Sequence, residues 1–118
     1  MRRLMLCGFV LAVAISELGD MVNAAATNSY DYFCTYDDRS AAPKITKYLT
    51  DIFSSTRYSG QLASDWTKYV QATYHTPVTT NGSCILALGD YGKSMRTYAE
   101  NNAKSNPKVT LIHVDWKE

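Results

Sequence analysis

The chain has 118 residues, and its 12 Lys and Arg against 11 Asp and Glu give a net charge of +1. This near balance, with no basic stripe along the chain, argues against nucleic acid as a partner. The length fits one small domain.

The first 24 residues have the features of an export signal. Arg2 and Arg3 form a positive end, and an uncharged apolar run of 12 residues follows. Small residues at the end of the segment suit a signal peptidase, with cleavage after Ala24, Ala25 or Ala26. Because the apolar run is too short to span a hydrocarbon core of ~30 Å, we predict a cleaved signal peptide, residues 1–24. The mature protein is then periplasmic or secreted.

Cleavage leaves 94 of the 118 residues and keeps the net charge at +1. The mature chain has no second apolar run of 18 residues, so we expect no membrane span after cleavage. Cleavage also removes Cys7 and leaves two cysteines, Cys34 and Cys84. In an oxidising compartment, two such cysteines are expected to form a disulfide with each other. Two unpaired buried thiols are the alternative. A metal site has less support, because only His75 and His113 would add ligands and the spacing matches no zinc site.

We expect a loose N-terminal tail over residues 25–29 and one domain over residues 30–118. Residues 30–36 alternate and are rich in β-forming types, which predicts a strand with tyrosines on one face and Phe33 on the other. A turn over residues 37–43 separates it from a second predicted strand, residues 45–53, so the two strands form a hairpin.

Helical periodicity begins at Ser59, a possible N-cap, and stops at Pro77. A short apolar strand follows at residues 84–87. Asp90 is a suitable N-cap for a second helix, which ends near Pro107. Residues 109–116 form the last predicted strand. The two helical stripes are Leu62, Trp66, Tyr69, Val70 and Tyr74 in the first helix, and Tyr91, Met95, Tyr98, Ala99 and Asn102 in the second.

The order ββαβαβ predicts an α+β domain in which two helices pack on one face of a four-stranded sheet. The last strand–helix–strand unit should be a right-handed parallel crossover. In this arrangement, the disulfide connects the first strand to the third.

Five segments in this order resemble a group of small exported bacterial proteins of unknown function. The group's pattern is Tyr-Tyr-Cys, Ser-Asp-Val-Phe, a helix with an aromatic stripe, a second Cys, a second helix and a terminal Gly-Trp-Lys. Asp115 departs from it, where the group tends to have Gly. The resemblance supports the order of elements and the disulfide, and it implies no activity or site residues. The matching segments are Tyr32-Phe33-Cys34, Thr50-Asp51-Ile52-Phe53, Trp66-x-x-Tyr69-Val70-x-x-x-Tyr74, Cys84 and Val114-x-Trp116-Lys117.

Residues 87–94, Ala-Leu-Gly-Asp-Tyr-Gly-Lys-Ser, fit a relaxed phosphate-loop pattern between a strand and a helix. The domain is too small for the parallel sheet that nucleotide chemistry requires, and nucleoside triphosphates are scarce outside the cytoplasm. Asp90 would also place a negative charge inside the anion cradle. Gly89 in a tight turn and Asp90 as a helix cap explain the segment without a nucleotide.

We predict a binding or interaction module whose partner is a protein or a cell-envelope component, with no cofactor and no catalytic residues assigned. The alternative is a small envelope hydrolase that uses Asp37, Asp38 or Asp51 with a histidine. The chain has 9 Tyr and 2 Trp, residues that anchor interfaces but also fill small cores. We expect the binding site on a sheet face that the helices leave open, at Tyr32, Tyr36, Asp37, Asp38, Arg39 and Trp116.

Overall fold

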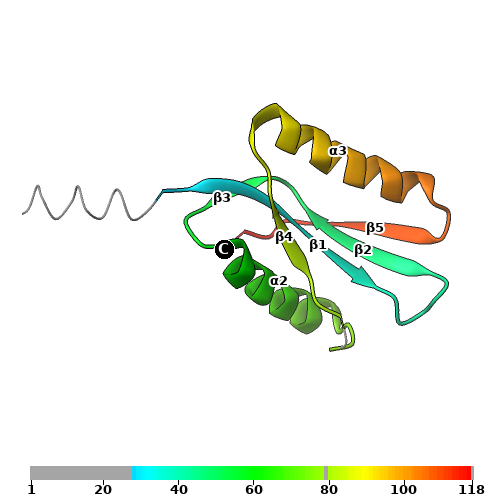
Figure 1. The fold of residues 1–118 in the computed structure, drawn as a ribbon. Helices are drawn as coiled ribbons and strands as arrows, with labels where there is room; N and C mark the ends of the chain where they lie inside the picture. Colours follow the sequence, from blue (N-terminus) through cyan, green and yellow to red (C-terminus); the bar gives the residue numbers. More distant parts are fainter. Residues whose placement is uncertain (1–27, 79, 118) are drawn as a thin grey trace, which may run out of the picture.

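The structure is a computed structural model that describes residues 28–78 and 80–117 (Figure 1). The predicted signal peptide and residues 25–27 of the predicted tail lie outside the described residues. The elements in chain order are β1 (Tyr30–Asp38), β2 (Ile45–Thr50), β3 (Phe53–Ser55), α2 (Ser59–Tyr74), β4 (Ser83–Leu86), α3 (Gly89–Ser105) and β5 (Val109–Val114).

The long strand β1 lies in the middle of a curled, mixed sheet and organises the rest. Along one side it pairs antiparallel with β4, and along the other side with both β2 and β3. β5 pairs in parallel with β2. The α+β class is therefore confirmed, and the sheet has one short strand more than the four that the sequence predicts.

The additional strand arises because the predicted second strand is interrupted. The ladder to β1 breaks at Asp51 and Ile52, which separates β2 from β3. Opposite the break, the backbone N–H of Cys34 donates to the hydroxyl Oγ1 of Thr50 at 2.9 Å. The Thr50 hydroxyl thus satisfies a buried backbone donor where the ladder is interrupted.

The two helices lie on opposite faces of the sheet (Figure 1), so the prediction that both pack on one face is wrong. β1 explains the difference, because successive side chains of a strand point to opposite faces. Cys34 packs under α2, whereas its neighbour Phe33 packs with the α3 side. With apolar side chains on both faces, the sheet requires a helix on each.

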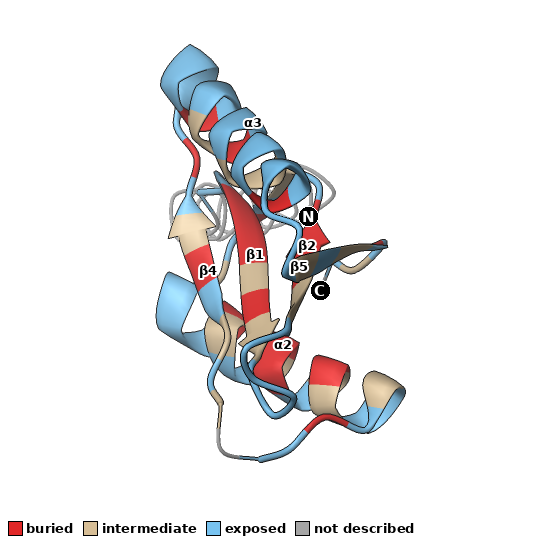
Figure 2. Cartoon of the chain, turned by 90° about the vertical axis from the view of Figure 1, so that its right-hand side faces the viewer, coloured by how far each residue is buried: buried red, intermediate tan, exposed pale blue. Residues whose placement is uncertain are grey.

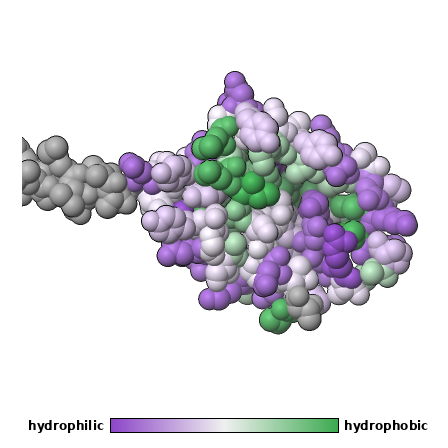
Figure 3. Space-filling view, viewed as in Figure 1, coloured by the Kyte–Doolittle hydropathy of each residue, from purple (hydrophilic) through white to green (hydrophobic). Residues whose placement is uncertain are grey.

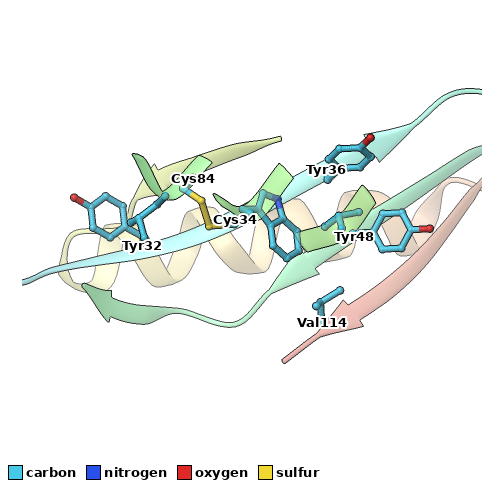
Figure 4. Close-up of a cluster of buried hydrophobic side chains, with 9 residues drawn as sticks. Tyr32, Cys34, Tyr36, Tyr48, Cys84 and Val114 are labelled. Carbon is cyan, nitrogen blue, oxygen red and sulfur yellow. A yellow bond between two sulfur atoms is a disulfide. The ribbon is translucent and has the colours of Figure 1, made fainter. Parts of the chain in front are cut away.

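The larger core lies between the sheet and α2 (Figure 4). Trp66 of α2 is fully buried there, and its indole Nε1–H donates to the backbone oxygen of Thr35 at 2.8 Å. The predicted disulfide is confirmed in the same core, where Cys34 and Cys84 lie directly opposite each other on β1 and β4. The buried members are Tyr32, Cys34, Tyr36, Tyr48, Leu62, Trp66, Val70, Cys84 and Val114.

The smaller core lies between the sheet and α3, around Phe33, Leu49 and Ala87. Gly92 brings α3 close to the chain just before it: a Cβ at this position would lie 2.3 Å from the backbone carbon of Ala87. Any side chain at Gly92 would push the helix away from the sheet.

α2 begins one residue earlier than an N-cap at Ser59 implies, and α3 begins two residues earlier than an N-cap at Asp90 implies. The N-cap residues are Tyr58 and Leu88, and neither helix has a side-chain cap hydrogen bond. Asp90 lies instead in the first turn of α3, where a carboxylate favours the positive end of the helix dipole. Within residues 28–78 and 80–117, no helix combines the length and hydrophobicity that crossing a bilayer requires.

Candidate functional site: a groove between α3 and the sheet

α3 covers only part of its face of the sheet, and a groove of about 600 Å³ remains beside it. We call this the α3 groove. Its floor comes from β1, β2 and β4, and its wall comes from one side of α3. The lining residues are Phe33, Thr35, Lys47, Ile85, Tyr91, Ser94, Met95, Tyr98 and Ala99.

The wall of the α3 groove contains two exposed tyrosines. Tyr91 and Tyr98 lie two helical turns apart, and they are 74% and 71% exposed. Large aromatic side chains in such positions supply contact area at a small cost in side-chain entropy. Two exposed rings of this kind give the wall a composition that is typical of binding surfaces.

The groove is nearly free of net charge. Lys47 is the charged residue of its lining, and its ammonium group lies 2.7 Å from the carboxylate of Asp37. Asp37 and Lys47 face each other across β1 and β2. Because Asp37 neutralises Lys47, the groove suits uncharged side chains.

Exposed apolar residues also occur where β4 leads into α3. Leu86, at the end of β4, is 41% exposed, and Leu88, just before α3, is 57% exposed. Figure 3 shows hydrophobic side chains gathered over the end of β4 and the start of α3. Exposed apolar patches of this kind mark interaction surfaces more often than isolated apolar residues do.

The predicted stripe of the second helix is confirmed in part, because Met95 and Ala99 pack against the smaller core. Tyr91 and Tyr98 of that stripe are exposed instead, and the buried residues of α3 are Gly92, Arg96 and Ala103. The close approach of Gly92 to Ala87 turns the small-residue side of the helix toward the sheet. Hydrophobicity alone does not indicate this orientation, because the buried residues include the charged Arg96.

The predicted binding face is not exposed. Tyr32 and Tyr36 are 4% and 1% exposed under α2, so the expectation that they present their rings to a partner is wrong. Their hydroxyls donate to the backbone oxygens of Arg57 and Pro77, at 3.0 and 3.1 Å. These tyrosines are core residues whose polar ends are satisfied within the fold.

Trp116 also belongs to the packing of the α2 side. Its ring centroid lies 5.4 Å from that of Trp66 and 5.7 Å from that of Phe53. Only part of the indole reaches solvent. The structure therefore places Trp116 with Tyr32 and Tyr36 on the α2 side of the sheet, away from the α3 groove.

Asp37 and Asp38 of the predicted acidic turn are successive residues of β1 and lie on opposite faces of the sheet. Asp37 pairs with Lys47 at the edge of the α3 groove, and Arg39 lies 3.5 Å from Asp37. Asp38 accepts a hydrogen bond from the backbone of Ser40 at 2.9 Å. On the α2 side, burial and the charge of Asp38 raise the pKa of the Tyr48 phenol above 10.0.

Asp51 and His113, two residues of the alternative, hydrolytic prediction, belong to an ion-pair network around Arg96. The buried guanidinium of Arg96 contacts Asp51 at 3.2 Å and Glu100 at 2.9 Å, and its Nε donates to the backbone oxygen of Thr50 at 2.6 Å. Glu100 also lies 2.9 Å from His113. The hydrogen bond from Arg96, followed by that from Lys104, holds the pKa of Glu100 below its ordinary value of 4.5.

Asp51 lines a cavity whose described lining residues include no histidine. A cavity of about 450 Å³ next to Asp51 has Asp115, Trp116 and Lys117 among its lining residues, but neither His75 nor His113. Asp51 therefore has no histidine beside it in this cavity to act on the same substrate bond. The geometry accounts for these charges as partners of a buried Arg96.

In the part of the chain that the structure describes, no three His, Cys, Asp or Glu side chains are grouped so that they would hold a metal ion. Comparison of the chain with known protein families, curated proteins and solved structures finds no match.

Proposed function

We propose that the protein is an exported binding module and that its partner occupies the α3 groove. The observation that carries this proposal is the pair of exposed tyrosines, Tyr91 and Tyr98, in the wall of an apolar and nearly uncharged groove. Apolar grooves with aromatic anchors are the common form of binding sites. The proposal moves the partner from the predicted tyrosine face of β1 to the opposite face of the sheet.

The predicted signal peptide supports action outside the cytoplasm, in the periplasm or in the medium. A disulfide in a domain this small agrees with such a compartment, because thiols in the cytosol are kept reduced. A partner would therefore be a protein or another component of the cell envelope.

Binding has more support than hydrolysis. The acids of the hydrolytic alternative are engaged elsewhere: Asp37 with Lys47, and Asp51 with Arg96. The α3 groove itself contains no carboxylate or histidine in its lining. The groove would therefore recognise a partner by its shape and by apolar contacts.

The test is capture of the natural partner by the mature domain from envelope and secreted fractions of the source cells. The double variant Tyr91→Ala and Tyr98→Ala should lose about 2 kcal/mol of binding free energy for each tyrosine that is an anchor. Tyr58→Ala is the matched control, because Tyr58 is 78% exposed and does not line the groove. Equal capture by wild type and by the double variant would refute the proposal.

A further inference from the structure

We propose that the partner presents an extended peptide, which adds to the sheet as a strand alongside β4 and places uncharged apolar side chains in the α3 groove. This inference rests on the proposed function and specifies the chemistry of the partner. It depends on the hydrogen-bonding pattern of β4, on the position of β4 in the sheet and on the composition of the groove.

The pairing of β1 with β4 determines which backbone groups of β4 point outward. The N–H of Cys34 donates to Thr50, away from β4, so Cys34 and Cys84 form a non-hydrogen-bonded pair. The adjacent pair, Phe33 and Ile85, is then the hydrogen-bonded one. The N–H of Ala87 donates to the backbone oxygen of Asp31 at 2.7 Å, which fits the same alternation.

Cys84 and Leu86 therefore direct their backbone N–H and C=O groups toward the outer edge of β4. Figure 2 shows β4 at one edge of the sheet, with β1 as its neighbour. Among the described residues, no strand other than β1 pairs with β4. The edge offers an extended backbone two donors and two acceptors at the spacing of an antiparallel or parallel ladder.

The sequence of β4 lacks the charged residues and the proline with which proteins often protect sheet edges. Its residues, Ser-Cys-Ile-Leu, include no charge and no proline. Proteins usually block exposed edge strands with Lys, Pro or a bulge, because an open edge pairs with other chains. An edge without charge or proline next to an apolar groove favours strand addition as the mode of binding.

The side chains of an added strand would meet the α3 groove in a defined way. Ile85 points to the α3 face and lines the groove, whereas Cys84 packs in the core under α2. An added residue beside Ile85 therefore projects to the same face, toward Tyr91. Because Asp37 already neutralises Lys47, that residue should be apolar and uncharged.

The probe is a short peptide of alternating threonine and valine with blocked termini, and the control is the same peptide N-methylated at alternate residues. Amide hydrogen exchange of the disulfide-bonded mature protein is measured by NMR. At a peptide concentration about ten times Kd, exchange at Cys84 and Leu86 should slow about tenfold, because the free fraction falls in that proportion. Exchange at Ile85 should change little, since its N–H already faces β1.

Leu86→Pro provides a variant that removes an outward donor. Proline is tolerated at an edge position whose N–H faces solvent, so the ladder to β1 should persist. The proline variant should lose peptide protection at Cys84, whereas Leu86→Thr, which keeps the N–H, should retain it. A thermal melt of each variant confirms that the domain is folded.

Three outcomes overturn the inference. Unchanged exchange at Cys84 and Leu86 with peptide shifts at Tyr91 and Tyr98 would mean that the groove binds its ligand without strand addition. Equal binding of the N-methylated peptide would exclude backbone pairing. If the amide of Leu86 became more protected from exchange as the protein concentration rose in the absence of peptide, the edge of β4 would pair with a second copy of this chain. The capture experiment on Tyr91 and Tyr98 tests the proposed function separately, so the two can fail independently.

Discussion

Phe33 and Cys34 are neighbours in β1, yet their side chains enter different cores on opposite faces of the sheet. A slip of β1 by one residue would exchange the two sets of side chains. The disulfide opposes such a slip, because it joins Cys34 to the residue directly opposite on β4. The bond therefore holds the strand register on which both cores depend.

Loss of the disulfide should destabilise the domain strongly. Cys34 and Cys84 are 50 residues apart, and closure of a loop of that length is worth about 4 kcal/mol on the chain-entropy model. The double variant Cys34→Ala and Cys84→Ala should lose about this much unfolding free energy in urea titrations. An unchanged midpoint would show that the bond contributes nothing to the fold.

Gly92→Ala should destabilise the domain by about 1–3 kcal/mol, because the added methyl group would collide with the backbone of Ala87. The matched control is Gly60→Ala in α2, where the new Cβ meets no atom within 4 Å. That change should be neutral or should stabilise by up to about 1 kcal/mol, because alanine favours helix. Thermal melts of both variants test the contrast, and equal melting temperatures would contradict the packing described for α3.

Glu100→Gln should reduce stability near neutral pH, and the deficit should disappear in acid. Hydrogen bonds from Arg96 and then Lys104 lower the pKa of Glu100 in the folded state. Because the pKa of Glu100 in the folded state is lower than its ordinary value of 4.5, the Glu100 carboxylate stabilises the fold at pH values above 4.5. This contribution is lost as the pH falls through the lower, folded-state pKa.

Denaturant titrations between neutral pH and pH 3 measure the difference between wild type and Glu100→Gln. Asp115→Asn is the control, because Asp115 is exposed and forms no ion pair among the described residues. A deficit that stays constant across the range would show that the charge of Glu100 is not its cause.

Strand periodicity in the sequence predicts much of this fold. The alternation of β1 assigns Tyr32, Cys34 and Tyr36 to one face and Phe33 to the other, as the structure confirms. The same alternation places Phe33 on the face opposite Cys34, so the sheet has apolar side chains on both faces and takes a helix on each. The break after Thr50 was not predictable, because a side-chain hydroxyl takes over a backbone bond there.

The candidate site was less predictable because hydrophobicity alone does not orient α3. Its aromatic residues, Tyr91 and Tyr98, form a stripe that resembles a core face. The residue that is buried instead is Arg96, whose charge is accommodated by Asp51 and Glu100. Such partners come from distant parts of the chain and become visible only in three dimensions.

Site-specific photo-crosslinking most directly tests the claim that the α3 groove binds the partner. A benzophenone side chain replaces Tyr98 in the exported protein, and the same side chain at Tyr58 provides the control outside the groove. The account predicts a specific adduct from position 98 and none from position 58 when the source cells are irradiated. An adduct from position 58 alone, or equal adducts from both positions, would contradict it.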